Sequence, residues 1–234
     1  MLHEVQIPFF SRPYKQFEVK VARFRNDQAK TQSEETLPNV LSLVFHPLWM
    51  PMLGILFILF WSGMYITLLP IEAKRIILLI VGLCMIGLPV ALLLFYRMYH
   101  WINSFYMSRR RERILPLICI AIFYYIAYRT LHNMHTPFII QKFILASTVA
   151  VFLASFISIF WKISLHGVGI GGVTGMVAAL TTVSPMLLPV LSAFIILSGL
   201  VGYARIRLNA HTPAQYYTGV LLGFGLMFEM FFII

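Results

Sequence analysis

Long apolar segments separated by short polar ones run through most of this chain, and they constrain its fold more than any other feature. Because lipid offers the backbone no hydrogen-bond partner, such segments cross a bilayer as helices of about 20 residues. The sequence therefore predicts an all-α, polytopic transmembrane bundle of six or seven spans. The candidate spans are residues 51–69, 76–96, 114–131, 143–161, 167–183, 186–204 and 214–234.

The composition agrees with a membrane protein and limits the chemistry of the chain. Its 234 residues are 60% hydrophobic and 11% charged, with a mean hydropathy of +0.85, whereas soluble domains are roughly 25% charged. Acidic residues beyond position 38 are Glu72, Glu112 and Glu229. Since Mg²⁺ and Ca²⁺ sites need clustered carboxylates, we expect no metal and no cofactor. The net charge of +10 indicates contact with the lipid bilayer or a phosphorylated lipid, with orientation bias as the alternative. We expect no nucleic-acid partner.

Two regions of the chain differ in composition. Residues 1–38 are polar and carry both signs of charge, which predicts an N-terminal tail, and residues 39–234 form the predicted transmembrane domain. Between them, Pro47 and Pro51 interrupt an apolar run, so an interfacial or re-entrant piece is expected before the first span. The sequence leaves the oligomeric state open.

Three polar segments are expected on one side of the membrane. They are residues 97–113, 162–166 and 205–215, and two predicted spans separate each segment from the next. An even number of crossings returns the chain to the same surface, so their basic and imidazole side chains can meet there. The Lys and Arg distribution favours the cytoplasm for this surface only weakly, which leaves the side of the membrane open.

The last of these segments carries the strongest candidates for chemistry. Arg205 lies six positions before His211, and Gln215 follows one helical turn later. The amide of Gln215 can hold the imidazole of His211 in one tautomer, and a guanidinium offers a planar fork of donors that matches phosphate oxygens. The segment therefore indicates phosphate binding, with a merely hydrated surface histidine as the alternative.

Further candidates come from the two other polar segments. His166 stands directly before a glycine-rich run that begins at Gly167, and a helix start there would present free N–H groups to an anion. Close helix packing is the alternative explanation of the glycines. Arg113 and Lys162 complete the predicted phosphate-binding set, although basic residues near span ends also serve as topology anchors or snorkel to the surface.

The pattern of these residues resembles a known family. Arg205, five residues, His211, three residues and then a hydrogen-bonding side chain resemble the third signature of the type 2 phosphatidic acid phosphatase and haloperoxidase superfamily. His166 resembles its second signature, and the resemblance covers roughly residues 113–223. Gln215 stands where the family has an Asp, and this substitution is similar to the pattern of dolichyl diphosphate phosphatases in the same superfamily. The first signature is reduced to Arg113 and a nearby proline.

This resemblance implies a fold and a reaction. It implies the phosphatase core of that superfamily, in a bacterial inner (plasma) membrane, hydrolysing a phosphate or diphosphate monoester of a lipid without metal. The lipid would be a polyprenyl diphosphate or a phosphatidate. His211 would form a phosphohistidine, His166 would protonate the leaving oxygen, and the guanidinium groups would neutralise the phosphoryl oxygens. The altered signatures leave two alternatives: a relative that binds or moves phosphorylated lipid with little or no catalysis, and a transporter with a polar mouth.

Overall fold

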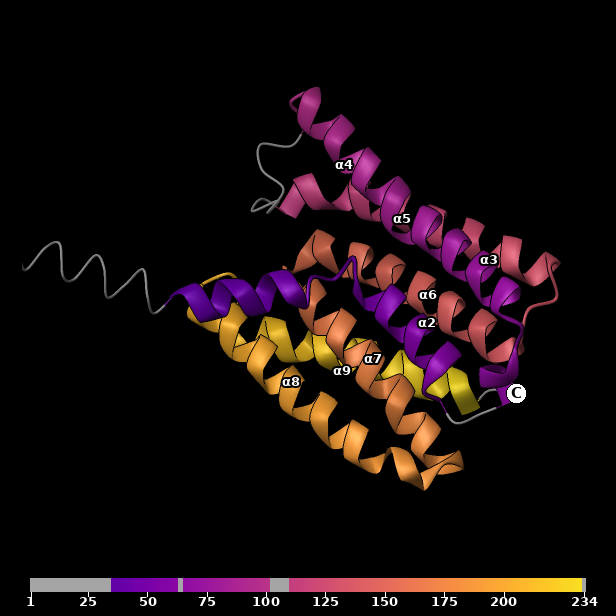
Figure 1. Ribbon diagram of the computed structural model, residues 1–234. Coiled ribbons are helices and arrows are strands. Elements are labelled where there is room, and N and C mark those ends of the chain that lie inside the picture. The colour runs from indigo at the N-terminus through magenta and orange to yellow at the C-terminus, as the bar shows by residue number, and fades with distance from the viewer. Residues whose placement is uncertain (1–34, 63–64, 102–109, 233–234) are drawn as a thin grey trace, which may run out of the picture.

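The computed structural model describes residues 35–62, 65–101 and 110–232, and every regular element within these ranges is helical (Figure 1). The predicted all-α class is confirmed for this part of the chain. Residues 35–44 form a first helix, which extends across the predicted tail boundary at 38. The elements that follow are α2 Met50–Phe60, η1 Tyr65–Leu68, α3 Ile71–Gly82, η2 Leu83–Gly87, α4 Leu88–Met98, α5 Arg110–Asn133, α6 Phe138–Phe160, α7 Leu165–Val183, η3 Pro185–Leu187, α8 Leu188–Arg207 and α9 Pro213–Phe232.

Five of the described helical segments are long and apolar enough to cross a membrane, which fits an integral membrane protein. They are Ile71–Met98, Arg113–Asn133, Phe138–Phe160, Leu165–Val183 and Pro185–Arg207. The first of them joins α3 to α4 through the π-helical turn η2. The two other predicted spans, 51–69 and 214–234, are not among these five, and the total of six or seven spans stays a prediction.

The two exceptions are α2 and α9. Within the predicted span 51–69 the helix ends at Phe60, and 11 residues at 1.5 Å each extend roughly 17 Å, about half the hydrocarbon thickness. The Ser62 hydroxyl donates to Ile58 O (2.8 Å) just beyond that end. The helix α9 has 20 residues and carries the polar Gln215 and Glu229 near its two ends.

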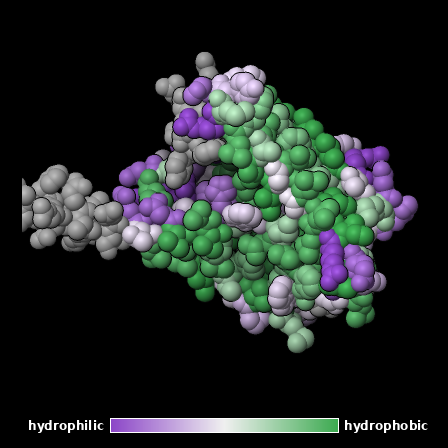
Figure 2. Space-filling view, turned by 45° about the horizontal axis from the view of Figure 1, so that its top comes forward, coloured by the Kyte–Doolittle hydropathy of each residue, from purple (hydrophilic) through white to green (hydrophobic). Residues whose placement is uncertain are grey.

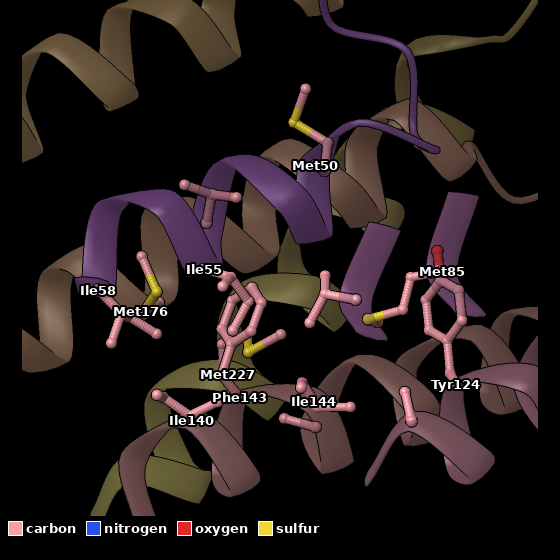
Figure 3. Packing of buried hydrophobic residues seen from close by; sticks show 14 of the residues in the cluster. Met50, Ile55, Ile58, Met85, Tyr124, Ile140, Phe143, Ile144, Met176 and Met227 are labelled. Carbon is pink, nitrogen blue, oxygen red and sulfur yellow. The ribbon is translucent and has the colours of Figure 1, made fainter. Parts of the chain in front are cut away.

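The short helix α2 is packed inside the bundle. Ile55, Ile58 and Leu59 are fully buried, and Figure 3 shows Ile55 and Ile58 beside Phe143 of α6 in the main hydrophobic cluster. Gly54 lies against the same ring, where a Cβ would overlap Phe143. Leu53 and Phe60 of the same helix are exposed, so α2 contributes one face to the core and turns another face outward.

The helices α7 and α9 pack against each other through glycine. A Cβ on Gly167 would lie 2.6 Å from Tyr216 O, and one on Gly219 would lie 2.5 Å from Ser164 O. Gly171, Gly175 and Gly223 likewise lie directly against backbone atoms of the facing helix. Small residues at this spacing let two backbones approach closely. Helix packing is therefore confirmed as one use of the glycine-rich run.

Polar groups gather at the two ends of the molecule. In Figure 1, the first helix, the start of α5, the α6–α7 connection and the α8–α9 turn lie at one end, and α3 begins at the other. Figure 2 shows hydrophilic residues at both ends of a largely hydrophobic surface. The described parts of the polar segments 97–113, 162–166 and 205–215 therefore share one end of the bundle.

Candidate functional site

His211 lies in a tight turn whose first half is the end of α8. The Asn209 N–H donates to Ile206 O (3.0 Å), and the Ala210 N–H donates to Arg205 O (3.1 Å). Asn209 has a φ of 50°. This bond pair with one left-handed residue is a Schellman motif, and asparagine tolerates that conformation better than most residues other than glycine.

The start of α9 forms the second half of the turn. The Gln215 N–H donates to Thr212 Oγ1 (3.3 Å), and the Thr212 N–H donates to Gln215 Oε1 (3.2 Å). This reciprocal pair is a capping box, and Pro213 suits the first helical position because its missing N–H is not needed there. Two adjoining helix caps thus set the spacing between Arg205 and His211.

Gln215 contacts His211 as the sequence predicted, but it has another task as well. Its side chain bonds to the imidazole, where it favours the charged ring, while its Oε1 accepts the Thr212 N–H. A neutral carboxamide stabilises an imidazolium less than a carboxylate does. Gln215 therefore serves the turn through its cap bonds, and it gives a positive charge on His211 less support than an aspartate would.

His166 lies in the first turn of α7, and a backbone carbonyl fixes its tautomer. Its Nε2 is 3.1 Å from Ser42 O. A carbonyl oxygen only accepts, so Nε2 carries the proton and donates, and Nδ1 of the neutral ring is left as an acceptor. The ring of His166 is thus oriented by a residue 124 positions away in the sequence.

The structure gives Gly167 a different use from the predicted phosphate contact. Its N–H donates to Oγ of Ser164, the N-cap residue of α7 (3.3 Å), so the side chain of that cap takes the predicted donor. Its Cα packs against the backbone of Tyr216. Gly167 is thus a capping and packing residue in the structure, and its phosphate contact stays a prediction.

Lys162 joins the α6–α7 connection to the α8–α9 turn that carries His211. Its Nζ donates to Ala210 O (3.1 Å), and the Ser164 N–H donates to Gln215 O (3.1 Å). These bonds hold the α6–α7 connection against the α8–α9 turn. The predicted proximity of residues 162–166 and 205–215 is present in the structure.

Three cations act electrostatically on His211. The charges of Arg113, Arg205 and Lys162 all act on its ring, and Arg205 acts on His166 as well. Burial, followed by these three charges, lowers the pKa of His211 from 6.5 to about 4. The ring is therefore neutral at pH 7, with its lone pair available to an electrophile.

Two buried nitrogens in this cluster have no hydrogen-bond partner among the described residues. They are Nη1 of Arg113 and Nδ1 of His211, whose side chains are 5% and 9% exposed. An unpaired buried polar group costs about 1–3 kcal/mol. A ligand that brings oxygen atoms and negative charge would relieve that cost at Arg113 and offset the mutual repulsion of the cations.

Residues 42–49 also contribute to the site, although the sequence did not predict this contribution. Ser42 orients His166, and the His46 ring meets the His166 ring edge to face, with centroids 5.5 Å apart. A polar His-Pro pair inside an otherwise apolar run was the available signal. It predicted a break in the helix, which is present, but said nothing of what the histidine would contact.

Within the described ranges, no three His, Cys, Asp or Glu side chains are grouped so that they could hold a metal ion. No protein-family model, curated protein or solved structure matches the chain. The function is therefore inferred from the cluster of basic and imidazole side chains: Arg113, Lys162, Arg205, His166 and His211.

Proposed function

We propose that the protein is a metal-independent lipid phosphatase acting on a phosphate or diphosphate monoester of a membrane lipid, of the polyprenyl diphosphate or phosphatidate type. The observation that carries the proposal is the unpaired nitrogen of His211 beside three cations. The cluster lies at one polar end of an apolar bundle, which is where the head group of a lipid would be. The proposed setting is a bacterial inner (plasma) membrane.

In the first step, a neutral His211 nitrogen attacks the phosphorus while the bond from phosphorus to the leaving oxygen breaks. A phosphohistidine forms, and Nδ1 of His166, which takes up a proton from solvent when the anionic substrate binds beside it, donates that proton to the leaving oxygen. Arg113, Arg205 and Lys162 neutralise the charge that develops on the phosphoryl oxygens. The pKa of about 4 serves this step because it keeps the nucleophile unprotonated at pH 7.

In the second step, water attacks the phosphohistidine. The Nδ1 of His166 accepts a proton from that water, because its Nε2 is already engaged with Ser42 O. The bond from phosphorus to His211 breaks, inorganic phosphate leaves, and the imidazole is regenerated. His166 therefore starts and ends the cycle with a proton on Nδ1, and water is the only other reactant.

A second candidate function is binding or movement of a phosphorylated lipid without turnover. The observation that favours it is the engagement of Gln215 in the helix cap, together with its lack of charge. An imidazolium at His211 then has weaker support than an aspartate would provide. On this alternative the same cations hold the head group, but the phosphohistidine does not form.

Phosphate release by the purified protein tests the proposal. With a polyprenyl diphosphate and a phosphatidate as substrates in detergent, we expect His211→Ala to lower release on the order of 1000-fold or more. The matched control is His135→Asn, at an exposed position with a φ of 54° that asparagine tolerates. Equal release from His211→Ala and wild type would rule out the phosphatase, and tight binding of lipid without release would favour the second candidate.

A further inference from the structure

The candidate site has two halves that share Arg205. On one side, the charges of Arg113 and Lys162 act on His211. On the other, Arg205 acts on His46 and His166, whose rings are in contact. The first half surrounds the proposed nucleophile, and the second surrounds the proposed proton donor. The second half therefore lies where the leaving group would be.

A backbone bond fixes the tautomer of His46. The Leu48 N–H donates to His46 Nδ1 (3.4 Å), so Nδ1 is the acceptor and Nε2 carries the proton of the neutral ring. Burial, and then the charge of Arg205, lower the pKa of His46, which keeps the ring neutral. The side chain is half-buried, so part of it remains accessible to a ligand.

We propose that His46 is a specificity residue that donates its Nε2–H to the leaving phosphate of a diphosphate substrate, so that the site prefers a diphosphate to a monophosphate. The inference rests on the phosphate-binding part of the proposed function. With His211 on the terminal phosphorus and His166 at the bridging oxygen, the inner phosphate lies beside His46 and Arg205. A lipid monophosphate leaves an uncharged alcohol there and gains nothing from this donor.

Titration of the full-length protein in detergent, without metal, with inorganic phosphate and with pyrophosphate tests the inference. We compare wild type with His46→Phe, which keeps a ring but has no donor, and with His46→Gln, whose amide can replace Nε2–H. Both variants lose the acceptor of the Leu48 N–H, so the difference between them isolates the donor. We expect His46→Phe to weaken pyrophosphate binding about 10-fold, with phosphate affinity nearly unchanged, and His46→Gln to retain most of it.

A second measurement does not depend on the variants. In wild type labelled with ¹⁵N-histidine, pyrophosphate should shift the Nε2 resonance of His46, and inorganic phosphate should leave it in place. The assignment of His46 would be overturned if His46→Phe lost affinity equally for both anions, or lost affinity for neither. It would also be overturned if pyrophosphate left the Nε2 resonance of His46 in place.

The outcomes separate this inference from the proposed function. Lipid hydrolysis with pyrophosphate binding that is indifferent to His46 rejects the inference and leaves the phosphatase in place. Pyrophosphate binding that depends on His46, in a protein that hydrolyses no lipid, rejects the phosphatase and retains the diphosphate site. A wild type that binds neither anion rejects both.

Discussion

His211 combines burial with three neighbouring cations, and this decides how the folded protein responds to acid. The pKa of its ring is lowered from 6.5 to about 4 in the folded state, so the unfolded chain binds a proton over a pH range in which the folded chain does not. At pH 7 both states are neutral, and the shift contributes nothing to stability. As pH falls from 6.5 towards 4, the free energy of unfolding decreases.

We expect thermal unfolding temperatures to fall over this pH range and to fall less steeply in His211→Gln. The substitution removes one group that must stay neutral in the folded state, so the two curves should converge at low pH. Melting of both proteins in detergent between pH 4 and 7 measures the difference. Parallel curves would show that His211 is not the group responsible.

The same shift predicts the pH dependence of hydrolysis. The acidic limb of kcat/KM reports the free enzyme, so the limb due to His211 should lie near pH 4, well below the ordinary value of 6.5. Lys162→Gln removes one of the charges that lower this pKa, and the limb should move to higher pH. Arg129→Gln, at an exposed position near the end of α5, is the control that should leave the profile unchanged. A limb that ignores Lys162 would argue against the cluster as the cause.

At the scale of elements, the α8–α9 turn places His211 through a left-handed residue. Asn209→Gly should preserve phosphate binding and stability, because glycine adopts a φ of 50° without strain. Asn209→Val should cost about 1–2 kcal/mol and weaken phosphate binding, since the Schellman bonds position the next residues. Thermal melts and phosphate titrations of the two variants check this. Equal behaviour of the two variants would mean that the cap does not hold the site.

Two glycines of α9 provide a matched test of the α7–α9 contact. A Cβ on Gly223 would overlap Val168 O, whereas one on Gly225 meets nothing within 4 Å. Gly223→Ala should therefore destabilise the protein by about 1–3 kcal/mol, while Gly225→Ala should be neutral or slightly stabilising. Unfolding in detergent measures both effects. If both substitutions were neutral, the close approach of these helices would be in doubt.

The sequence predicted long helices and a common end for three polar segments. The length of each apolar segment, and the even number of segments between the polar ones, can be read directly along the chain. It could not predict that one face of α2 lies in the core, since an apolar segment has the same composition whether lipid or protein faces it. The bond from His166 to Ser42 joins residues 124 positions apart, and no local pattern announces it. The spacing of Thr212 and Gln215 fits a capping box, so the cap bonds compete with the predicted contact between Gln215 and His211.

For the whole molecule, the shared end of the polar segments predicts a one-sided labelling pattern. In a Cys84→Ser, Cys119→Ser background, Trp161→Cys and Ala214→Cys should react with a membrane-impermeant thiol reagent from the same side. Met134→Cys, in the exposed α5–α6 connection, should react only from the opposite side. Labelling in sealed vesicles of known orientation measures this. Reaction of positions 161 and 214 from opposite sides would contradict the arrangement of α7, α8 and α9.

The glycine contact between α7 and α9 also limits how the chain can vary over time. At Gly171, Gly175 and Gly223 a Cβ would overlap the facing backbone, so these positions do not tolerate larger residues. At Gly199 and Gly225 a Cβ would meet nothing within 4 Å, so substitutions there are tolerated. Homologous chains should therefore retain glycine at the first three positions even where their lipid-facing surfaces have diverged beyond recognition. The glycines of α7 and α9 should therefore be retained together, because a larger residue in either helix would disrupt the contact with the other.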